Sequence, residues 1–264
     1  MSNISHLPSN ILLTIDIGNT NMVFGFWNGD KLTSTHRLET RHNRSSDEYF
    51  VFISPFLNNL NITPKNIQKI IVSSVVPQVK YEFTKFCKEY LNKKPVFISD
   101  IKDKLKLKIR IEKPEELGAD RIVNSLAAQH IYKRTPLVII DLGTATTFDV
   151  VDKNGGYIGG IIAPGINLSL DALQKAAAKL PKITVTKTKN IIGKNTVTAM
   201  QSGIYNGYAS MLEGVINKIS IELGKKPFVI ATGGLSSLFA DVKIINELDE
   251  DLTLKGLKII AHLL

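Results

Sequence analysis

Two stretches of the chain share one pattern, in which an apolar run ends at an aspartate and a glycine and a second apolar run follows. They span residues 11–27 (ILLTIDIGNTNMVFGFW) and 137–151 (LVIIDLGTATTFDVV). The apolar runs predict buried strands, and the residues between them predict a tight turn. A hairpin turn also follows each stretch, at residues 28–30 and 154–156. We therefore expect each half of the chain to open with the same strand–turn–strand unit.

Helical and strand periodicities alternate along the rest of the chain. The expected elements are a helix at 47–60 capped by Ser46 and kinked at Pro55, a strand at 69–77, helices at 79–92 and 116–133, a strand of alternating basic and apolar residues at 102–111, a long helix at 196–224, a strand at 226–234 and a closing segment at 254–264. Strands alternate with helices in both halves, so the predicted class is α/β. We place the boundary at about residues 130–136, giving domains 1–132 and 133–264.

Cys87 is the only cysteine of the chain. It lies on the apolar face of the expected helix 79–92, together with Phe83, Phe86, Tyr90 and Leu91, so we interpret it as a core residue and not as a reactive thiol. A single cysteine excludes an intrachain disulfide and any zinc site with several cysteine ligands. It also fits a reducing compartment.

Composition adds a bias toward anionic partners. The 264 residues include 33 Lys and Arg against 24 Asp and Glu, a net charge of +9, and 44% of them are hydrophobic. This is a globular composition, long enough for about two domains with a core each. The positive charge favours nucleotides, acidic metabolites or nucleic acid as partners. The histidines are scattered, at His6, His36, His42, His130 and His262, which predicts no transition-metal site.

The hydropathy pattern predicts no membrane partner. No apolar run reaches the roughly 18 residues of a transmembrane helix. The first ten residues lack the basic segment of a signal peptide. We therefore expect a cytoplasmic protein.

The alternating segment 102–111 has two interpretations. Its lysines and arginine would share one face of a strand and could follow a nucleic-acid backbone. No aromatic residues are interleaved with them, which favours a solvated or edge-protecting strand. The pattern therefore disfavours nucleic acid as a partner.

The two Asp-x-Gly turns carry groups suited to phosphate chemistry. Asp16 and Asp141 each end a buried strand, and Gly18 and Gly143 let the backbone approach an anion closely. Carboxylates and hydroxyls are ligands for Mg²⁺, and backbone N–H groups bind phosphate. A single Asp-x-Gly is most simply a turn former, but two copies after buried strands favour phosphate binding. Neither a Walker A loop nor a Gly-x-Gly-x-x-Gly motif follows any expected strand.

Residues 118–121, Gly-Ala-Asp-Arg, offer a second candidate centre. Asp120 lies near the start of the expected helix 116–133, where backbone amides favour its ionised form, and an ionised carboxylate beside a substrate hydroxyl is a general base. Arg121 could neutralise phosphate charge. Alternatively, Asp120 only caps the helix and Arg121 forms a surface ion pair.

Two glycines spaced four residues apart lie in the expected long helix. Gly203 and Gly207 suit close packing of another backbone, from the other domain or from a second subunit.

Several motifs together resemble a known family. The two Asp-x-Gly loops and the late Ala231-Thr232-Gly233-Gly234 turn are similar to the superfamily of actin, hexokinase and heat-shock chaperone ATPases, which implies two ribonuclease-H-like domains with an ATP cleft between them. Within it, the chain resembles the type III pantothenate kinases. The strings that carry this resemblance, in order, are DIGNTN (16–21), SSVVP (73–77), ELGADRI (116–122), DLGTATTFDVV (141–151), GGIIAPG (159–165), KLP (179–181) and GKNT (193–196).

The resemblance implies roles for individual residues. Contacts to ATP fall to Asp16, Ile17, Gly18, Asn19, Thr20, Asn21, Met22, Val23, Thr144, Gly233 and Gly234, with Asp16 near Mg²⁺. Asp141 would bind the activating monovalent cation, K⁺ or NH₄⁺. Pantothenate would contact Gly118, Ala119, Asp120, Arg121 and Thr196, with Asp120 as proton acceptor. Members are homodimers whose substrate site is completed at the interface.

One position departs from the family pattern. Many members carry Tyr seven residues before the glycine of the Gly-Ala-Asp-Arg motif, where this chain has Ile111. A hydroxyl contact to the substrate is therefore missing, which affects the pose of pantothenate and not the reaction.

Three functions remain to be compared. The first is ATP-dependent phosphorylation of pantothenate, the first step of coenzyme A biosynthesis. The second keeps the fold and phosphorylates a sugar or another small alcohol. The third is a non-catalytic nucleotide-binding regulator, against which the joint presence of Asp16, Asp120 and Asp141 argues, because a regulator needs no general base.

Overall fold

The computed structural model describes residues 10–177 and 180–264 and divides the chain into two compact units. Unit 1 comprises Met1–Lys106, Glu116–Ala127 and Thr253–Leu264, and unit 2 comprises Leu107–Glu115 and Ala128–Leu252. His6 and Lys179 of the KLP string lie outside the described residues. Within the described part of the chain, no helix combines the length and hydropathy needed to cross a membrane.

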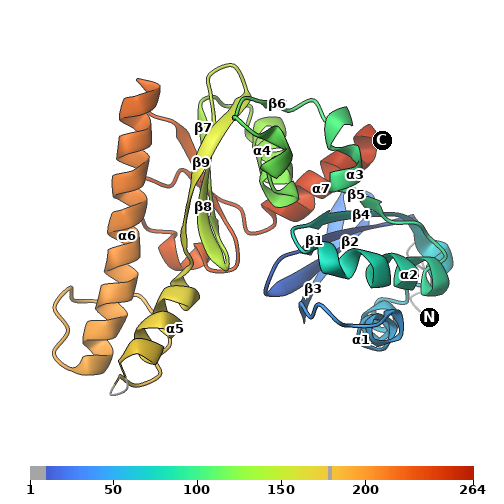
Figure 1. Ribbon diagram of the computed structural model, residues 1–264, viewed down its shortest axis with the longest axis horizontal. Coiled ribbons are helices and arrows are strands. Elements are labelled where there is room, and N and C mark those ends of the chain that lie inside the picture. Colours follow the sequence, from blue (N-terminus) through green and yellow to red (C-terminus); the bar gives the residue numbers. More distant parts are fainter. Residues whose placement is uncertain (1–9, 178–179) are drawn as a thin grey trace, which may run out of the picture. The chain divides into compact units, whose positions relative to one another are not determined.

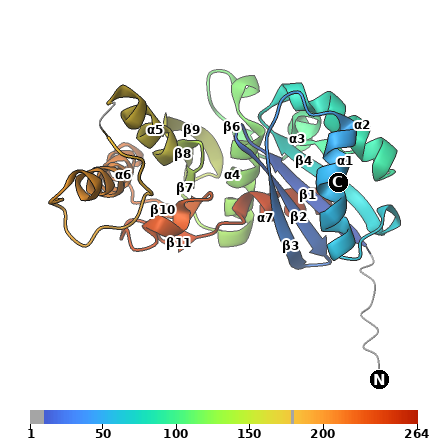
Figure 2. The same ribbon diagram turned by 90° about the horizontal axis from the view of Figure 1, so that it is seen from below.

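Unit 1 is built on a five-stranded sheet. Its strands are β1 (Ile11–Ile17), β2 (Asn21–Asn28), β3 (Lys31–Glu39), β4 (Ile67–Ser74) and β5 (Val96–Phe97), in the order β3-β2-β1-β4-β5. β1 pairs antiparallel with β2 and parallel with β4 (Figure 2). The predicted strand–turn–strand unit is therefore the centre of this sheet.

Helices cover both faces of the unit 1 sheet. α1 (Ser46–Asn59) and α2 (Lys80–Tyr90) pack against one face through a shared apolar core (Figure 1). On the other face, Leu254 of α7 (Leu252–Leu263) lies against Gly25 of β2, where a side chain would collide with Thr14 as well. Cys87 in α2 is fully buried, which raises the pKa of its thiol and confirms it as a core residue.

The cap of α1 differs from the prediction. Ser45, not Ser46, is the N-cap: its hydroxyl accepts the Glu48 N–H at 3.2 Å, while the Glu48 carboxylate accepts the Ser45 N–H at 2.9 Å. This is a capping box. Ser46 is buried, and its N–H donates to Glu82 Oε2 at 2.9 Å. Two adjacent serines satisfy the same sequence signature, and only the helix start decides between them.

Unit 2 repeats the strand order of unit 1 and adds one edge strand. Its strands are β6 (Lys108–Ile109), β7 (Leu137–Leu142), β8 (Ala145–Val151), β9 (Gly156–Pro164), β10 (Phe228–Thr232) and β11 (Glu247–Leu248), in the order β11-β10-β7-β8-β9-β6. β7 pairs antiparallel with β8 and parallel with β10, as β1 does with β2 and β4. The expected internal repeat is confirmed at the level of topology.

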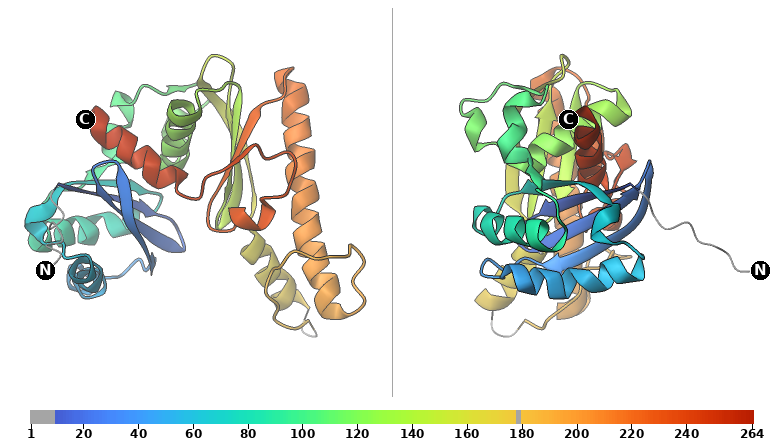
Figure 3. Two further views of the ribbon diagram at one scale, coloured as in Figure 1. Left: turned by 180° about the vertical axis from the view of Figure 1, so that it is seen from behind. Right: turned by 90° about the vertical axis from the view of Figure 1, so that its right-hand side faces the viewer.

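The long helix α6 (Thr196–Leu223) packs along the unit 2 sheet (Figure 3). Helix α5 (Ile166–Ala176) follows β9 and contacts β8 and α6. Asn195 caps α6 at its start, and Gly224 ends it with a left-handed φ of 64°. The remaining helices are α3 (Ile98–Ile101), α4 (Ala119–Tyr132) and short 3₁₀ turns at Pro64–Asn66, Pro77–Val79, Lys102–Lys104, Pro114–Glu116 and Ser236–Phe239.

The strand predicted at 102–111 is wrong for most of its length. Residues 102–104 form a 3₁₀ turn closed by the Leu105 N–H on the Lys102 carbonyl, and only Lys108–Ile109 forms a strand. These two residues pair with Gly156 and Tyr157 at the edge of the unit 2 sheet. Alternation was a misleading signal because the preceding residues have no neighbouring strand, although an edge position was one of the two interpretations.

The two units do not follow a single division at residue 132/133. The chain returns to unit 1 at its end, where Gly256 of α7 lies against Val123 and Ala127 of α4. A side chain at Gly256 would collide with the Val123 carbonyl, at 2.8 Å. Local patterns mark where each strand unit starts, but they do not indicate which core a terminal helix joins.

Candidate functional site

The first Asp-x-Gly loop lies at the carboxyl end of β1. Asp16 and Ile17 are the last residues of that strand, and the Gly18 N–H closes the turn on the Asn21 carbonyl at 3.0 Å. Asn19, Thr20 and Asn21 are exposed, whereas Ile17 and Met22 are fully buried. Among the predicted ATP contacts, Ile17 and Met22 therefore present no accessible surface in this structure.

Asp120 is brought to the same edge of the unit 1 sheet. Asp16 pairs with Ser73 of the parallel strand β4, and the next turn begins with the Val75 N–H donating to the Ile17 carbonyl at 3.1 Å. A Cβ built on Gly118 would lie 3.6 Å from Val75 and only 2.5 Å from Asp120 Oδ1. Gly118 thus makes room for the Asp120 carboxylate at the start of α4.

Burial raises the pKa values of both carboxyl groups. Burial raises the pKa of Asp16 to about 7, and the negative charge of Asp120 adds to the rise, while the Ser73 hydroxyl opposes it. Burial also raises the pKa of Asp120, against the Arg121 N–H, which donates to Asp120 Oδ1 at 2.8 Å, and the positive charge of Arg121. The predicted effect of the helix amides is present, since backbone N–H bonds lower the pKa of Asp120, but loss of hydration outweighs it and the net pKa is raised.

Two partly buried carboxyl groups with raised pKa values form a candidate catalytic site. A carboxyl group with a raised pKa is a stronger base, and a pair of negative charges favours a cation. Within residues 10–177 and 180–264 no group of three or more His, Cys, Asp and Glu side chains could hold a metal alone. A Mg²⁺ ion at Asp16 would therefore take its other ligands from phosphate oxygens and water, which is its usual coordination.

The raised pKa of Asp16 predicts an unusual effect on stability. Its folded pKa of about 7 exceeds the ordinary value of 3.8. The stability that goes with the protonated group is complete below about pH 4 and is lost as pH rises through 7. Asp16→Asn cannot ionise, so its free energy of unfolding should exceed that of the wild type by a difference that grows from pH 4 to 7, to a few kcal/mol. Urea unfolding without nucleotide or metal measures this, and a pH-independent difference would contradict it.

The second Asp-x-Gly loop lies at the carboxyl edge of the unit 2 sheet. Asp141 of β7 pairs with Thr232 of the parallel strand β10, and Gly233 follows with a φ of +91°. A Cβ on Gly233 would lie 2.5 Å from Asp141 Oδ1. Gly165, at the end of β9, lies against the Thr144 and Gly143 carbonyls, so that a side chain there would overlap them. Gly233 thus lets the backbone approach the Asp141 carboxylate, and Gly165 lets it approach the second Asp-x-Gly turn.

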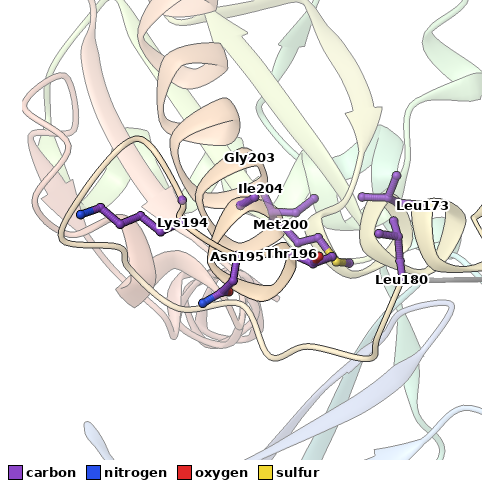
Figure 4. Close-up of a pocket in the computed structure, with 10 residues that line it drawn as sticks. Leu173, Leu180, Lys194, Asn195, Thr196, Met200, Gly203 and Ile204 are labelled. Atoms are coloured by element: carbon purple, nitrogen blue, oxygen red, sulfur yellow. The ribbon is translucent and has the colours of Figure 1, made fainter.

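Thr196 lies elsewhere in unit 2, at the first turn of α6. It lines a pocket of about 710 Å³ together with Leu173, Leu180, Met200 and Ile204 (Figure 4). Lys194 and Asn195 also line this pocket. The Asn195 side chain accepts the Thr198 N–H at 2.9 Å and so fixes the start of the helix.

The structure thus gathers the predicted residues into three places. Unit 1 brings together Asp16–Val23 and Gly118–Arg121, unit 2 brings together Asp141, Thr144, Gly233 and Gly234, and Thr196 lies at the α6 pocket. Sequence reasoning gave no role to Thr40, which bonds the first loop. Ser73 was quoted only as part of a motif, although its position at the end of a strand parallel to β1 marks it as a neighbour of Asp16.

Comparison with known proteins gives consistent matches over nearly the whole chain. The family model described as type III pantothenate kinase matches residues 12–218. A type III pantothenate kinase of Paramagnetospirillum magneticum is 47% identical over 248 residues, covering 94% of this chain and 95% of the relative. That of Rhodospirillum rubrum is 45% identical over 251 residues, covering 95% and 97%.

Solved structures show the fold. A conserved putative Baf family transcriptional activator from Campylobacter jejuni has a TM-score of 0.58 at 21% identity, covering 95% of this chain and 97% of the other. A putative 2-dehydro-3-deoxygalactonokinase from Sinorhizobium meliloti has a TM-score of 0.57 at 8% identity, covering 96% of both chains. With the repeated strand order, these similarities confirm the actin-like ATPase fold.

Proposed function

The chain belongs to the type III pantothenate kinase family, and from this premise we propose that Asp120 takes the proton of the hydroxyl group that is phosphorylated. The reaction is the ATP-dependent phosphorylation of pantothenate, the first step of coenzyme A biosynthesis. The observation that carries the proposal is that Asp120 and Asp16 lie at the same edge of the unit 1 sheet. Burial raises the pKa values of both carboxyl groups there.

The proposed step moves one proton and one phosphoryl group. The primary hydroxyl oxygen of pantothenate forms a bond to the γ-phosphorus of ATP, and the bond from that phosphorus to the leaving ADP oxygen breaks. The hydroxyl proton passes to a carboxylate oxygen of Asp120. Because burial raises the pKa of Asp120, the carboxylate holds this proton more readily than an exposed one would.

Asp16 is proposed to hold Mg²⁺. Its carboxylate oxygen suits this hard cation, and the cost of its burial beside Asp120 would be offset by positive charge. Bound Mg²⁺ would neutralise phosphate charge. The loop Asp16–Val23, with Thr144, Gly233 and Gly234, supplies the proposed contacts to ATP.

Asp141 is proposed to hold a monovalent cation, K⁺ or NH₄⁺. Its oxygen donors and the close approach of Gly233 suit an ion bound by oxygen ligands. When bound, such an ion supplies positive charge near the phosphates that Mg²⁺ leaves partly unneutralised.

Pantothenate is proposed to contact Gly118–Arg121 and, through a separate element, Thr196. Arg121 follows Asp120 in the first turn of α4 and suits the negative charge of the substrate or of the transferred phosphate. Because this chain has Ile111 where many family members have Tyr, one hydroxyl is absent from the proposed pantothenate contacts. We also place the reaction in the cytoplasm, where ATP is supplied.

We propose that the protein acts as a homodimer. Apolar side chains are exposed around the start of α6 and on α5, at Leu168, Leu173, Ile191, Ile192 and Val197. A Cβ on Gly203 or Gly207 would meet no atom of the described residues within 4 Å, so this helix face is open to another backbone. An apolar surface of this kind is typical of a subunit interface.

Sedimentation velocity at micromolar concentration tests the dimer. We expect one species at twice the monomer mass, because burial of these apolar side chains favours association. Val197→Asp places a charge on the exposed apolar surface and should shift the species toward monomer. Tyr81→Asp, at an exposed position of α2, should not. A wild-type protein that sediments only as a monomer would contradict the proposal.

A comparison of phosphate acceptors tests the substrate. ADP release with ATP, Mg²⁺ and K⁺ should depend on pantothenate and remain at background with sugars and other small alcohols. Equal rates with another alcohol would favour the same-fold kinase alternative. Nucleotide binding without ADP release, with any acceptor, would favour the regulatory alternative.

A further inference from the structure

The first Asp-x-Gly loop is held by one residue of a neighbouring strand end. Thr40 directly follows β3 and is 9% exposed. Its hydroxyl donates to the Gly18 carbonyl at 2.7 Å, and its N–H donates to the Thr20 carbonyl at 2.9 Å. Thr40 alone therefore donates hydrogen bonds to two carbonyls of the loop, one from its hydroxyl and one from its backbone N–H.

These two bonds determine where the amides of the loop point. A trans peptide group directs its C=O and its N–H to opposite sides. Because the Gly18 and Thr20 carbonyls face Thr40, the N–H groups of Asn19 and Asn21 point away from it. Loop amides that point the same way are the groups that bind phosphate oxygens.

Arg44 fixes the backbone next to Thr40. Arg44 is 3% exposed, and its Nη1 donates to the Glu39 carbonyl at 3.1 Å. Its guanidinium carbon lies 4.6 Å from the centroid of the Phe52 ring on α1. Glu39 in turn pairs with Asn21, so the end of β3 is fixed between the loop and α1. The backbone around Thr40 is thus held by strand pairing with β2 and by the contacts of Arg44.

We propose that Thr40 is a positioning residue for the phosphates of ATP, acting through the backbone of residues 18–20. Its hydroxyl holds the Gly18–Asn19 peptide in the orientation that presents the Asn19 amide. The inference rests on the proposed role of this loop in ATP binding, and it adds a residue outside the loop.

The test compares three variants. Thr40→Val keeps the shape of the side chain but removes the hydroxyl, and Thr40→Ser keeps the hydroxyl. Thr33→Val is the matched control, since the hydroxyl of Thr33 on β3 donates to the Phe26 carbonyl of β2 at 2.7 Å, away from the loop. Each Val variant loses one side chain to backbone bond of equal length.

We expect Thr40→Val to raise the KM for ATP and the Kd for MgATP by about tenfold, since one misdirected charge-assisted bond is worth roughly that factor. Thr40→Ser should restore both values to within about threefold, and Thr33→Val should leave them unchanged. The KM for pantothenate should change little. Thr40→Val should lower the Tm more than Thr33→Val, because Thr40 is buried whereas Thr33 is exposed.

A merely structural role for Thr40 would lower the Tm without changing the Kd for MgATP, and that result would overturn the proposal. So would an equal change of Kd in Thr33→Val. Calorimetric titration with MgATP, in the absence of pantothenate, does not require phosphoryl transfer. If the wild type binds MgATP but transfers no phosphate, the proposed function fails while the Thr40 comparison still gives an answer. If Thr40→Val does not fold, Thr40→Ala serves in the same comparison.

Discussion

Asp120→Asn is expected to lower turnover by about 10²–10⁴-fold while MgATP binds almost as before. The attacking hydroxyl is a poor nucleophile while it keeps its proton, and Asn cannot accept that proton. The amide preserves the size of the side chain and can still accept the Arg121 N–H at its oxygen. Single-turnover rates with saturating ATP and pantothenate measure the chemical step, and a separate titration measures the Kd for MgATP.

The same substitution tests the alternative role of Asp120 as a helix cap. Asn and Asp are equally good near helix starts, so a capping residue would tolerate the change with nearly normal turnover. Normal turnover in Asp120→Asn would remove Asp120 from the mechanism. Because burial raises the pKa of Asp120, its ionisation opposes folding above its ordinary pKa. Asp120→Asn should therefore be at least as stable as the wild type at pH 8.

Asp141→Asn is expected to remove most of the activity together with its response to K⁺ or NH₄⁺. The change removes the negative charge that would hold the ion, whereas the nearby Gly233 backbone can stay in place because Asn has the size of Asp. The measurement is initial rate against K⁺ concentration, with Na⁺ replacing K⁺ at constant ionic strength. The wild type should show saturable activation.

Asp149→Asn is a suitable comparison for Asp141→Asn. Asp149 is a buried carboxylate of β8 that accepts the Tyr157 hydroxyl at 2.9 Å, and we assign it no ion. Asp149→Asn should leave the K⁺ response intact even if it lowers stability. A fully active Asp141→Asn protein that still responds to K⁺ would show that Asp141 has another role.

The repeated strand–turn–strand unit could be predicted from the sequence. Asp16 and Asp141 end equivalent strands because each follows an apolar run and precedes a glycine turn, and both facts are local. Each of these strands pairs antiparallel with the strand after it and parallel with a later strand, so the two sheets have the same strand order. The serine that caps α1 was misassigned by one position because adjacent Ser45 and Ser46 look alike in sequence.

The site itself depends on long-range packing. Asp16 and Asp120 come together only because β4 lies beside β1 and leads to Val75, against which Gly118 packs. The raised pKa of Asp120 depends on burial, which no local motif reports and which outweighs the backbone hydrogen bonds at the helix start that lower this pKa as predicted. Thr40 was missed because a threonine after a strand carries no motif, and it reaches the loop only because β3 pairs with β2.

The most direct test of the central claim is the mass and position of the phosphorylated product. Wild-type protein incubated with ATP, Mg²⁺, K⁺ and pantothenate should convert pantothenate to a species heavier by one phosphoryl group, carried on the primary hydroxyl, with one ADP formed per product. Asp120→Asn should form the same species about 10²–10⁴-fold more slowly. Folded wild-type protein that binds MgATP yet yields no phosphopantothenate would contradict the claim.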